Sequence, residues 1–179
     1  MTVTGGRGKK TQSQIKNERR QALADFGEDR AFRLLKHRFD VIEKMPPNFP
    51  FFDLMARQGT RTFLIPVKTR TKFKPNGDLR TADYNLYWKE DHFPSVSKIA
   101  SFFGAKIVWV AVTVDPATKT FCAYMGDVTS NPPLPRYIPM HPTRHVPDHD
   151  CLASNWPDEA ISLSWRKITE TVSANEDQP

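Results

Sequence analysis

Two charged residues stand in otherwise apolar stretches of the chain. Asp53 lies in the run 51–56, and Lys68 lies near the end of the run 63–71. Charges in core strands are costly unless they are paired or used chemically. A carboxylate can hold a hard cation such as Mg²⁺, and a lysine is a compact point charge that can stabilise a phosphate. The alternative is a cross-strand ion pair between the two side chains, worth at most ~1 kcal/mol if it is exposed.

A third candidate, Glu28, lies on a predicted helix over 14–38. It shares a helix face with Ala24 and Leu35, so its carboxylate points towards the apolar side. The alternative is a peripheral or salt-bridged acid, because unpaired charges are seldom fully buried. Gly27 lowers helix stability, and this predicts either close packing against a neighbour or a break in the helix.

The remaining elements follow from hydrophobic patterning. They are strands at 41–45, 51–56 and 63–71, a short helix at 95–103, and strands at 106–114 and 120–125. A tight turn at 57–61 joins the second and third strands. The strand at 106–114 is apolar on both faces, which is typical of a central, covered strand. The order of elements predicts an α/β fold with a mixed central β-sheet flanked by helices.

This arrangement of an acid in the first helix, an aspartate on the second strand and a lysine on the third resembles the PD-(D/E)XK nuclease superfamily. The matching residues are Gly27-Glu28, Asp53-Leu54 and Val67-Lys68-Thr69. The chain looks most like the branch of Holliday-junction resolvases and small intron-associated endonucleases. The resemblance covers about residues 22–128 and implies a restriction-endonuclease-like αβββαβ core.

The resemblance also implies an activity, a Mg²⁺- or Mn²⁺-dependent endonuclease that hydrolyses phosphodiester bonds in DNA. Such a metal neutralises developing charge and lowers the pKa of the attacking water. Asp53 would be the central metal ligand, with Glu28 and the Val67 carbonyl as further ligands. Lys68 would orient the nucleophilic water or stabilise the pentacovalent phosphate.

Pro66 departs from the superfamily pattern, which has Glu, Asp or Gln two residues before the lysine. Strand alternation places residue 66 on the same face as Lys68, so a metal-contacting group is missing there. Proline also removes a ladder hydrogen bond, which predicts a bulge in the strand. Either Glu28 or Glu43 compensates and the enzyme is active, or the domain binds nucleic acid without cutting it. A protein-interaction domain with the same fold is a third reading.

Positive charge is concentrated at the start of the chain, which has a net charge of +6 overall. Residues 1–20 contain six lysines or arginines and one acid. Such an arm suits sequence-independent contact with phosphates, although a solubilising tail is an equal alternative. The residues expected to contact nucleic acid are Lys9, Lys10, Arg19, Arg20, Arg70, Lys72 and Lys74. The aromatic residues Tyr84, Tyr87 and Trp88 more simply cap a core than stack on bases.

The C-terminal part is rich in proline, which predicts a wrap-around extension at 129–168. We expect no regular structure over 129–157 and a short strand or helix at 160–165. A basic arm at 1–20, a nuclease-like core at 21–128 and an acidic tail at 169–179 complete the expected organisation. The histidines at 141, 145 and 149 have no known zinc spacing. Cys122 and Cys151 are too few for a disulfide framework, and no apolar run could span a membrane, so we expect a cytoplasmic protein. The expected partner is nucleic acid, most simply DNA; a homodimer is left open.

Overall fold

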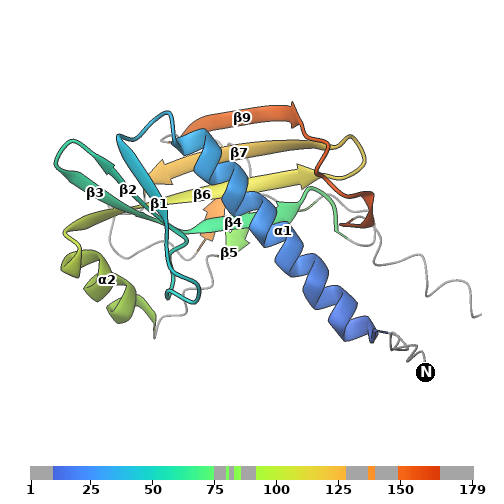
Figure 1. Ribbon diagram of the computed structural model, residues 1–179, viewed down its shortest axis with the longest axis horizontal. Helices are drawn as coiled ribbons and strands as arrows, with labels where there is room; N and C mark the ends of the chain where they lie inside the picture. The colour runs from blue at the N-terminus through green and yellow to red at the C-terminus, as the bar shows by residue number, and fades with distance from the viewer. Residues whose placement is uncertain are drawn as a thin grey trace, which may run out of the picture.

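The computed structural model describes residues 10–74, 80, 83–85, 92–127, 137–139 and 149–165. Its main sheet has seven strands: β1 (Val41–Lys44), β2 (Leu54–Gln58), β3 (Arg61–Ile65), β4 (Val67–Thr71), β6 (Ala105–Asp115), β7 (Thr120–Asp127) and β9 (His149–Pro157). The order is β1-β2-β3-β6-β7-β9, with β4 also paired to β6 (Figure 1). β3 and β4 run parallel to β6, and the other pairings are antiparallel. The predicted mixed sheet is confirmed.

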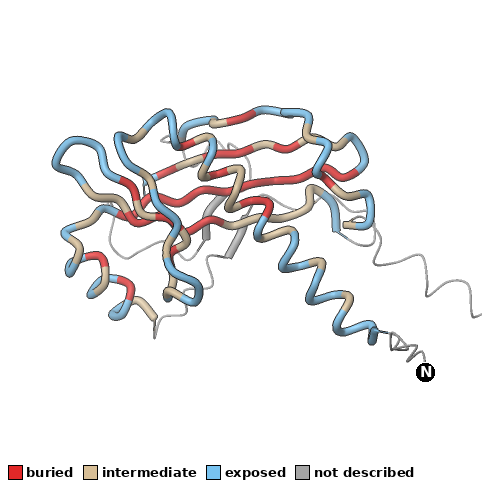
Figure 2. Tube along the Cα trace, viewed as in Figure 1, coloured by how far each residue is buried: buried red, intermediate tan, exposed pale blue. Residues whose placement is uncertain are grey.

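Two helices cover opposite faces of this sheet, and β6 explains how. α1 (Gln12–Leu35) packs on the valines at the even-numbered positions of β6, whereas α2 (Phe93–Phe102) packs on the face that holds Ile107 and Trp109. Because side chains alternate along a strand, a strand covered on both faces must be apolar at every position. Figure 2 shows the resulting continuous buried stretch along β6. The predicted central strand is therefore confirmed, as are both flanking helices.

α1 is fixed to the sheet through Gly27. A Cβ atom added to Gly27 would lie 1.7 Å from the Thr69 Oγ1 atom of β4, far inside contact distance. The close packing anticipated for this glycine is therefore confirmed, and the helix is continuous through it. The helix starts two residues earlier than predicted, because Thr11 and Gln14 form a capping box at its N-terminus. Residues 12–20, expected in the arm, are thus helical.

The hairpin between β2 and β3 turns at Gly59, as predicted. Gly59 has a φ of +56°, and Gln58 pairs with Arg61 across the turn. β2 begins at Leu54 rather than at residue 51, because Phe51 has a φ of +71°, outside the extended region. Asp53 therefore lies at the entry to the strand and not within it.

Pro66 separates β3 from β4 without shifting the chain. Leu64 pairs with Ile107 before the proline and Val67 pairs with Val110 after it, so the offset to β6 is the same on both sides. The Pro66 carbonyl still accepts a hydrogen bond from the Val110 N–H at 3.0 Å. The predicted bulge is wrong: the proline interrupts the ladder, but no residue is inserted.

The expectation of no regular structure over 129–157 is wrong for its last part. β9 pairs with β7 across residues 149–157, with irregular register near Ala123, and β5 (Asp83–Asn85) pairs with β8 (Tyr137–Pro139). The prolines of this region stop at Pro147 and resume only at Pro157, so nothing prevents a strand between them. A 3₁₀ helix, η2 (Leu163–Trp165), provides the short helix expected near the end.

Some expectations fall on residues outside the described part, among them Lys9, Tyr87, Trp88, His141 and His145. The side chains of Tyr84 and His149 are likewise not described. Within the described residues, neither helix combines the length and the apolar character needed to cross a membrane.

Candidate active site

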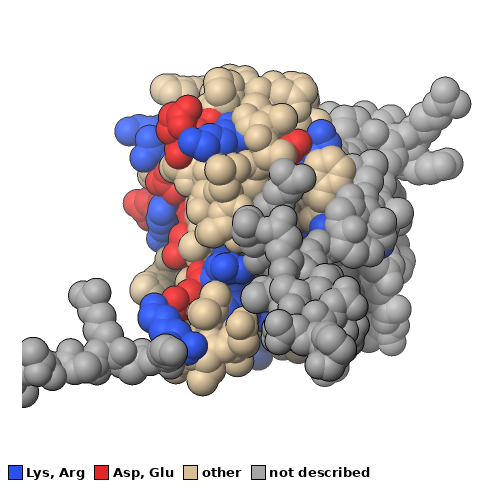
Figure 3. Space-filling view, turned by 90° about the vertical axis from the view of Figure 1, so that its right-hand side faces the viewer, with Lys and Arg blue, Asp and Glu red and all other residues tan. Residues whose placement is uncertain are grey.

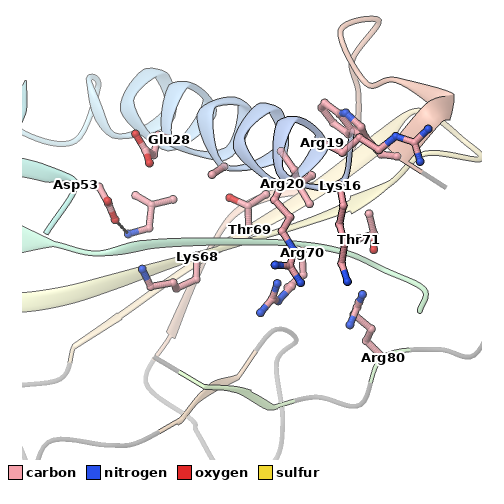
Figure 4. Close-up of a pocket in the computed structure, with 14 residues that line it drawn as sticks. Lys16, Arg19, Arg20, Glu28, Asp53, Lys68, Thr69, Arg70, Thr71 and Arg80 are labelled. Carbon is pink, nitrogen blue, oxygen red and sulfur yellow. Dashed lines mark hydrogen bonds between the residues drawn. The ribbon is translucent and has the colours of Figure 1, made fainter. Parts of the chain in front are cut away.

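A cleft of about 690 Å³ lies between α1 and β4. Its lining includes Glu28, Asp53 and Lys68, the three residues selected from the sequence. The two carboxylates lie at one end, and basic side chains occupy the other (Figure 4). The cleft lining is Lys16, Arg19, Arg20, Leu23, Ala24, Glu28, Asp53, Val67, Lys68, Thr69, Arg70, Thr71, Arg80 and Trp165.

The cleft opens where β2 stops pairing with its neighbour. The last pair is Leu54 with Ile65, and within the described residues β4 pairs with β6 alone. The Asp53 N–H still donates to the Ile65 carbonyl at 3.0 Å. Beyond this point the Asp53 side chain, and not a neighbouring strand, accepts from the backbone of β4. Its Oδ2 atom accepts a hydrogen bond from the Val67 N–H at 2.6 Å. One carboxylate oxygen is thus held by the backbone of β4.

Glu28 reaches the same region from α1, where the contact at Gly27 brings the helix close to β4. Burial is the main cause that raises its pKa, and the charge of Asp53 raises it further. Lys44 and Lys68 act in the opposite direction. Asp53 is thus one of two acids whose charge disfavours the anionic form of Glu28, the other being Asp25.

Asp53 shows the same direction of shift. Burial raises the pKa of its carboxyl, while Lys68 and the Val67 N–H lower it. Two carboxylates that share a partly buried site cost free energy when both are charged, and a bound cation would offset this cost. The pair therefore has the electrostatics of a site that favours a cation.

Lys68 leaves β4 on the side opposite Thr69, so it points away from α1 (Figure 4). It influences both carboxylates, but no ion pair joins it to Asp53 within 4.0 Å in the described part of the chain. The alternative that these residues form a simple cross-strand ion pair is therefore wrong. Lys68 remains beside the acids with its ammonium group available to a ligand.

The cleft offers a Mg²⁺ ion only a small number of side-chain ligands. Mg²⁺ is commonly held by one or two carboxylates together with waters, and Glu28 and Asp53 supply two. Pro66 supplies no ligand, and Glu43 is exposed on β1 and does not line the cleft. The described residues hold no group of three or more His, Cys, Asp or Glu side chains suited to a metal. Val67 lines the cleft, as its expected role as a carbonyl ligand requires.

The residues expected to contact nucleic acid divide into two groups. Arg19, Arg20 and Arg70 line the cleft. Lys10 forms an exposed ion pair with Glu18 at 2.7 Å, and Lys72 lies 3.4 Å from Asp115. Lys74 is exposed outside the cleft lining. The first group thus shares a cavity with the carboxylates, and the second does not.

The cleft residues that were not selected from the sequence include Lys16, Arg80 and Trp165. Lys16 lies four residues before the selected Arg20, so helical spacing could have placed it beside that residue. Arg80 and Trp165 come from distant parts of the chain. No local sequence signal could have brought them to the cleft.

The chain matches no known protein-family model, and no curated protein sequence matches it. Among solved structures, it is similar to Hjc of Archaeoglobus fulgidus, a Holliday junction resolvase from an archaeal hyperthermophile, whose structure was determined at 1.6 Å resolution. The TM-score is 0.42 and the sequence identity is 15%. The match covers 64% of this chain and 87% of that one.

Proposed function

We propose that this protein is a metal-dependent endonuclease that hydrolyses phosphodiester bonds in DNA, with Glu28, Asp53 and Lys68 in its active site. One observation carries the proposal. These three residues come from three separate parts of the chain and line one cleft, and every other ionisable side chain in its lining is a cation. An anionic polymer is the natural ligand for such a cleft, because phosphate neutralisation dominates nucleic-acid affinity.

Glu28 and Asp53 would hold the metal, Mg²⁺ or Mn²⁺, with the Val67 carbonyl as a further ligand. When bound, such an ion neutralises charge on the phosphate and lowers the pKa of a bound water. Asp53 is already oriented by the Val67 N–H, which leaves its other carboxylate oxygen for this role. The missing ligand at Pro66 predicts weak metal binding, with more of the coordination sphere filled by water.

Lys68 would stabilise the developing negative charge on the phosphate or orient the attacking water. Its compact ammonium group suits either role. Arg70, two residues further along β4, lies on the same face by strand alternation and would position the neighbouring phosphate. The chain's own contribution is therefore orientation and charge, supplied by side chains on a regular strand.

The test is nicking of supercoiled plasmid by the purified full-length chain in Mg²⁺ or Mn²⁺. Asp53→Asn preserves the size of the side chain and an oxygen that can accept from Val67, but removes the charge. We expect it to lower the nicking rate about 100-fold or more. Glu43→Gln is the matched control, because it removes an exposed carboxylate on β1 outside the cleft, and it should nick at the wild-type rate. Equal nicking by wild type and Asp53→Asn would contradict the proposal.

A second candidate function, a DNA-binding module without catalysis, is favoured by Pro66 and by the two-carboxylate donor set. This function predicts that no metal supports nicking, while substitution of Arg20 or Arg70 still weakens DNA binding.

Either function would operate in a reducing compartment, in line with the free thiols of Cys122 and Cys151. We accordingly place the protein in the cytoplasm.

A further inference from the structure

Charged side chains lie at both ends of the cleft (Figure 4). The side of α1 that lines the cleft contributes Lys16, Arg20 and Glu28, and twelve residues of helix separate the first from the last. At 1.5 Å per residue this is about 18 Å, or at most about five phosphates of a strand spaced as in B-DNA. This side of the helix therefore offers a track that leads from the carboxylates to the first turns of the helix.

The part of the lining outside α1 is also basic. Arg70 follows Lys68 on β4, and Arg80 lies across from the helix near Lys16 and Arg20 (Figure 4). Within the described residues, no ion pair engages Lys16, Arg20 or Lys68. Six cations face two carboxylates in the lining, so the cleft carries a net positive charge. Figure 3 views the end of the molecule where α1 begins, with basic side chains in its lower part and both basic and acidic side chains above them.

An aromatic side chain also belongs to the cleft lining. Trp165 closes η2, lines the cleft, and packs edge-on against the ring of Phe26 at 5.4 Å between centroids. Its segment is anchored twice, by the fully buried Ile161 and by the ion pair between Asp158 and Arg30 of α1. The indole is therefore held in place against the core while part of it faces the cleft.

The size of the cleft restricts what can enter. A volume of about 690 Å³ falls in the range of pockets for single small ligands, about 300–1,000 Å³. A duplex presents two backbones separated by grooves about 6 and 12 Å wide, so it would lie across the mouth. A single strand can enter, because it needs room for one backbone and one row of bases.

We propose that the cleft binds a single-stranded segment of DNA, with its phosphates along Lys16, Arg20 and Arg70 and a base stacked on Trp165. A basic groove that follows the backbone, combined with an aromatic platform, is how proteins hold single strands without sequence preference. The choice of DNA rests on the proposed endonuclease function. The endonuclease would then act where single-stranded DNA meets the carboxylates, for example in a flap or an overhang.

The test is fluorescence anisotropy with the full-length chain in EDTA, so that binding is measured without cleavage. The probes are a labelled 12-mer oligothymidylate and a labelled blunt hairpin duplex with a 12-base-pair stem. We expect the single strand to bind at least about tenfold more tightly, and Trp165→Ala to weaken its binding about tenfold or more. Trp156→Ala is the matched control, because Trp156 is a half-exposed indole that also packs edge-on against a phenylalanine but lies on β9 outside the cleft.

A second pair of variants tests the track without touching the core. Lys16→Gln with Arg20→Gln should make the salt dependence of single-strand binding shallower by about 0.7 in log–log slope per charge removed. Arg61→Gln, an exposed arginine of β3 outside the cleft, should leave the slope unchanged. Equal affinity for both probes, or an unchanged slope in the double variant, would overturn the proposal. Because no cleavage is measured, single-strand binding by a protein that nicks nothing would support this inference and reject the endonuclease.

Discussion

Carboxyl groups beside α1 have pKa values shifted in opposite directions, with Asp158 on one side of the comparison and Glu28 and Asp53 on the other. Asp158 is held by Arg30, whose Nη2 donates to Oδ1 at 3.0 Å, and this hydrogen bond lowers the pKa of Asp158. Glu28 and Asp53 have no such partner among the described side chains, and burial raises the pKa of both. The charged form of Asp158 is therefore favoured by its surroundings, whereas the charged forms of Glu28 and Asp53 are disfavoured.

The difference separates structure from function on a single helix. The pair of Arg30 and Asp158 joins the segment after β9 to α1 and satisfies its own charges. Burial disfavours the charged forms of Glu28 and Asp53, and such groups cluster where a ligand compensates for them. The contrast makes predictions that can be ordered by the size of the expected effect.

The largest effect is expected at Gly27, on which the position of Glu28 depends. Gly27→Ala places a methyl group within 3.0 Å of three atoms of Thr69, so α1 must move away from β4. We expect the free energy of unfolding to fall by about 1–3 kcal/mol, and nicking to fall further than the loss of folded protein explains. Denaturant unfolding and nicking at equal folded concentration check this.

Two variants control the Gly27 experiment. Gly27→Ala with Thr69→Ala removes two of the three close contacts and should recover part of the stability. Gly59→Ala strains a turn with φ of +56° where a Cβ meets nothing within 4 Å, so it should cost stability but leave nicking unchanged. A Gly27→Ala protein with wild-type stability and nicking would show that helix docking does not set the geometry of the site.

The next effect is expected at Asp158. Asp158→Asn breaks a charge-assisted hydrogen bond in a mostly buried pair and should lower the free energy of unfolding by about 2 kcal/mol near pH 7. Because the pKa of Asp158 is lowered by folding, this contribution is present above its unfolded value near 3.8 and is lost as the pH falls through the folded value. The difference between wild type and variant should therefore shrink in acid.

Glu159→Gln is the matched control for Asp158, because Glu159 forms an ion pair with Lys119 but is 90% exposed. Exposed pairs contribute little, so its stability should stay within about 0.5 kcal/mol of wild type. A loss of stability in Asp158→Asn no larger than that in Glu159→Gln would contradict the assignment of this pair to structure.

The smallest effect has the opposite sign. Glu28→Gln should raise the melting temperature at pH 7 in EDTA, because it removes a charge that burial and Asp53 disfavour. A raised carboxyl pKa means that wild-type stability falls as the pH rises from 4.5 through the folded value, so the advantage of the variant should vanish below pH 4.5. Added Mg²⁺ should stabilise wild type more than the variant. A variant less stable than wild type at pH 7 would reverse our account of Glu28.

Local patterning was sufficient to predict the core of the fold and to select three side chains that line one cleft. Glu28 was identified from helical spacing, and Asp53 and Lys68 from single charges in apolar runs, because these signals lie within a few residues of each site. The central strand was predicted for the same reason, since burial on both faces leaves a continuous apolar run in the sequence.

Features that depend on distant contacts could not be predicted in this way. Trp165 and Arg80 reach the cleft through tertiary packing, and β9 follows a proline-rich stretch that hides it. The effect of Pro66 was overestimated, because its neighbours on both sides keep the same register with β6 and hold the chain straight. Local sequence rules give the hydrogen bond that a proline removes from a strand, but not the pairing of the residues on either side of it.

The central claim is that Glu28 and Asp53 together bind a divalent metal. The most direct measurement is an anomalous difference map from a crystal of the full-length protein soaked in MnCl₂, with Asp53→Asn crystals treated in the same way. We predict a peak within coordination distance of carboxylate oxygens from both residues, and its loss in the variant. A wild-type map without a peak at this position, or with one that contacts neither carboxylate, would contradict the account.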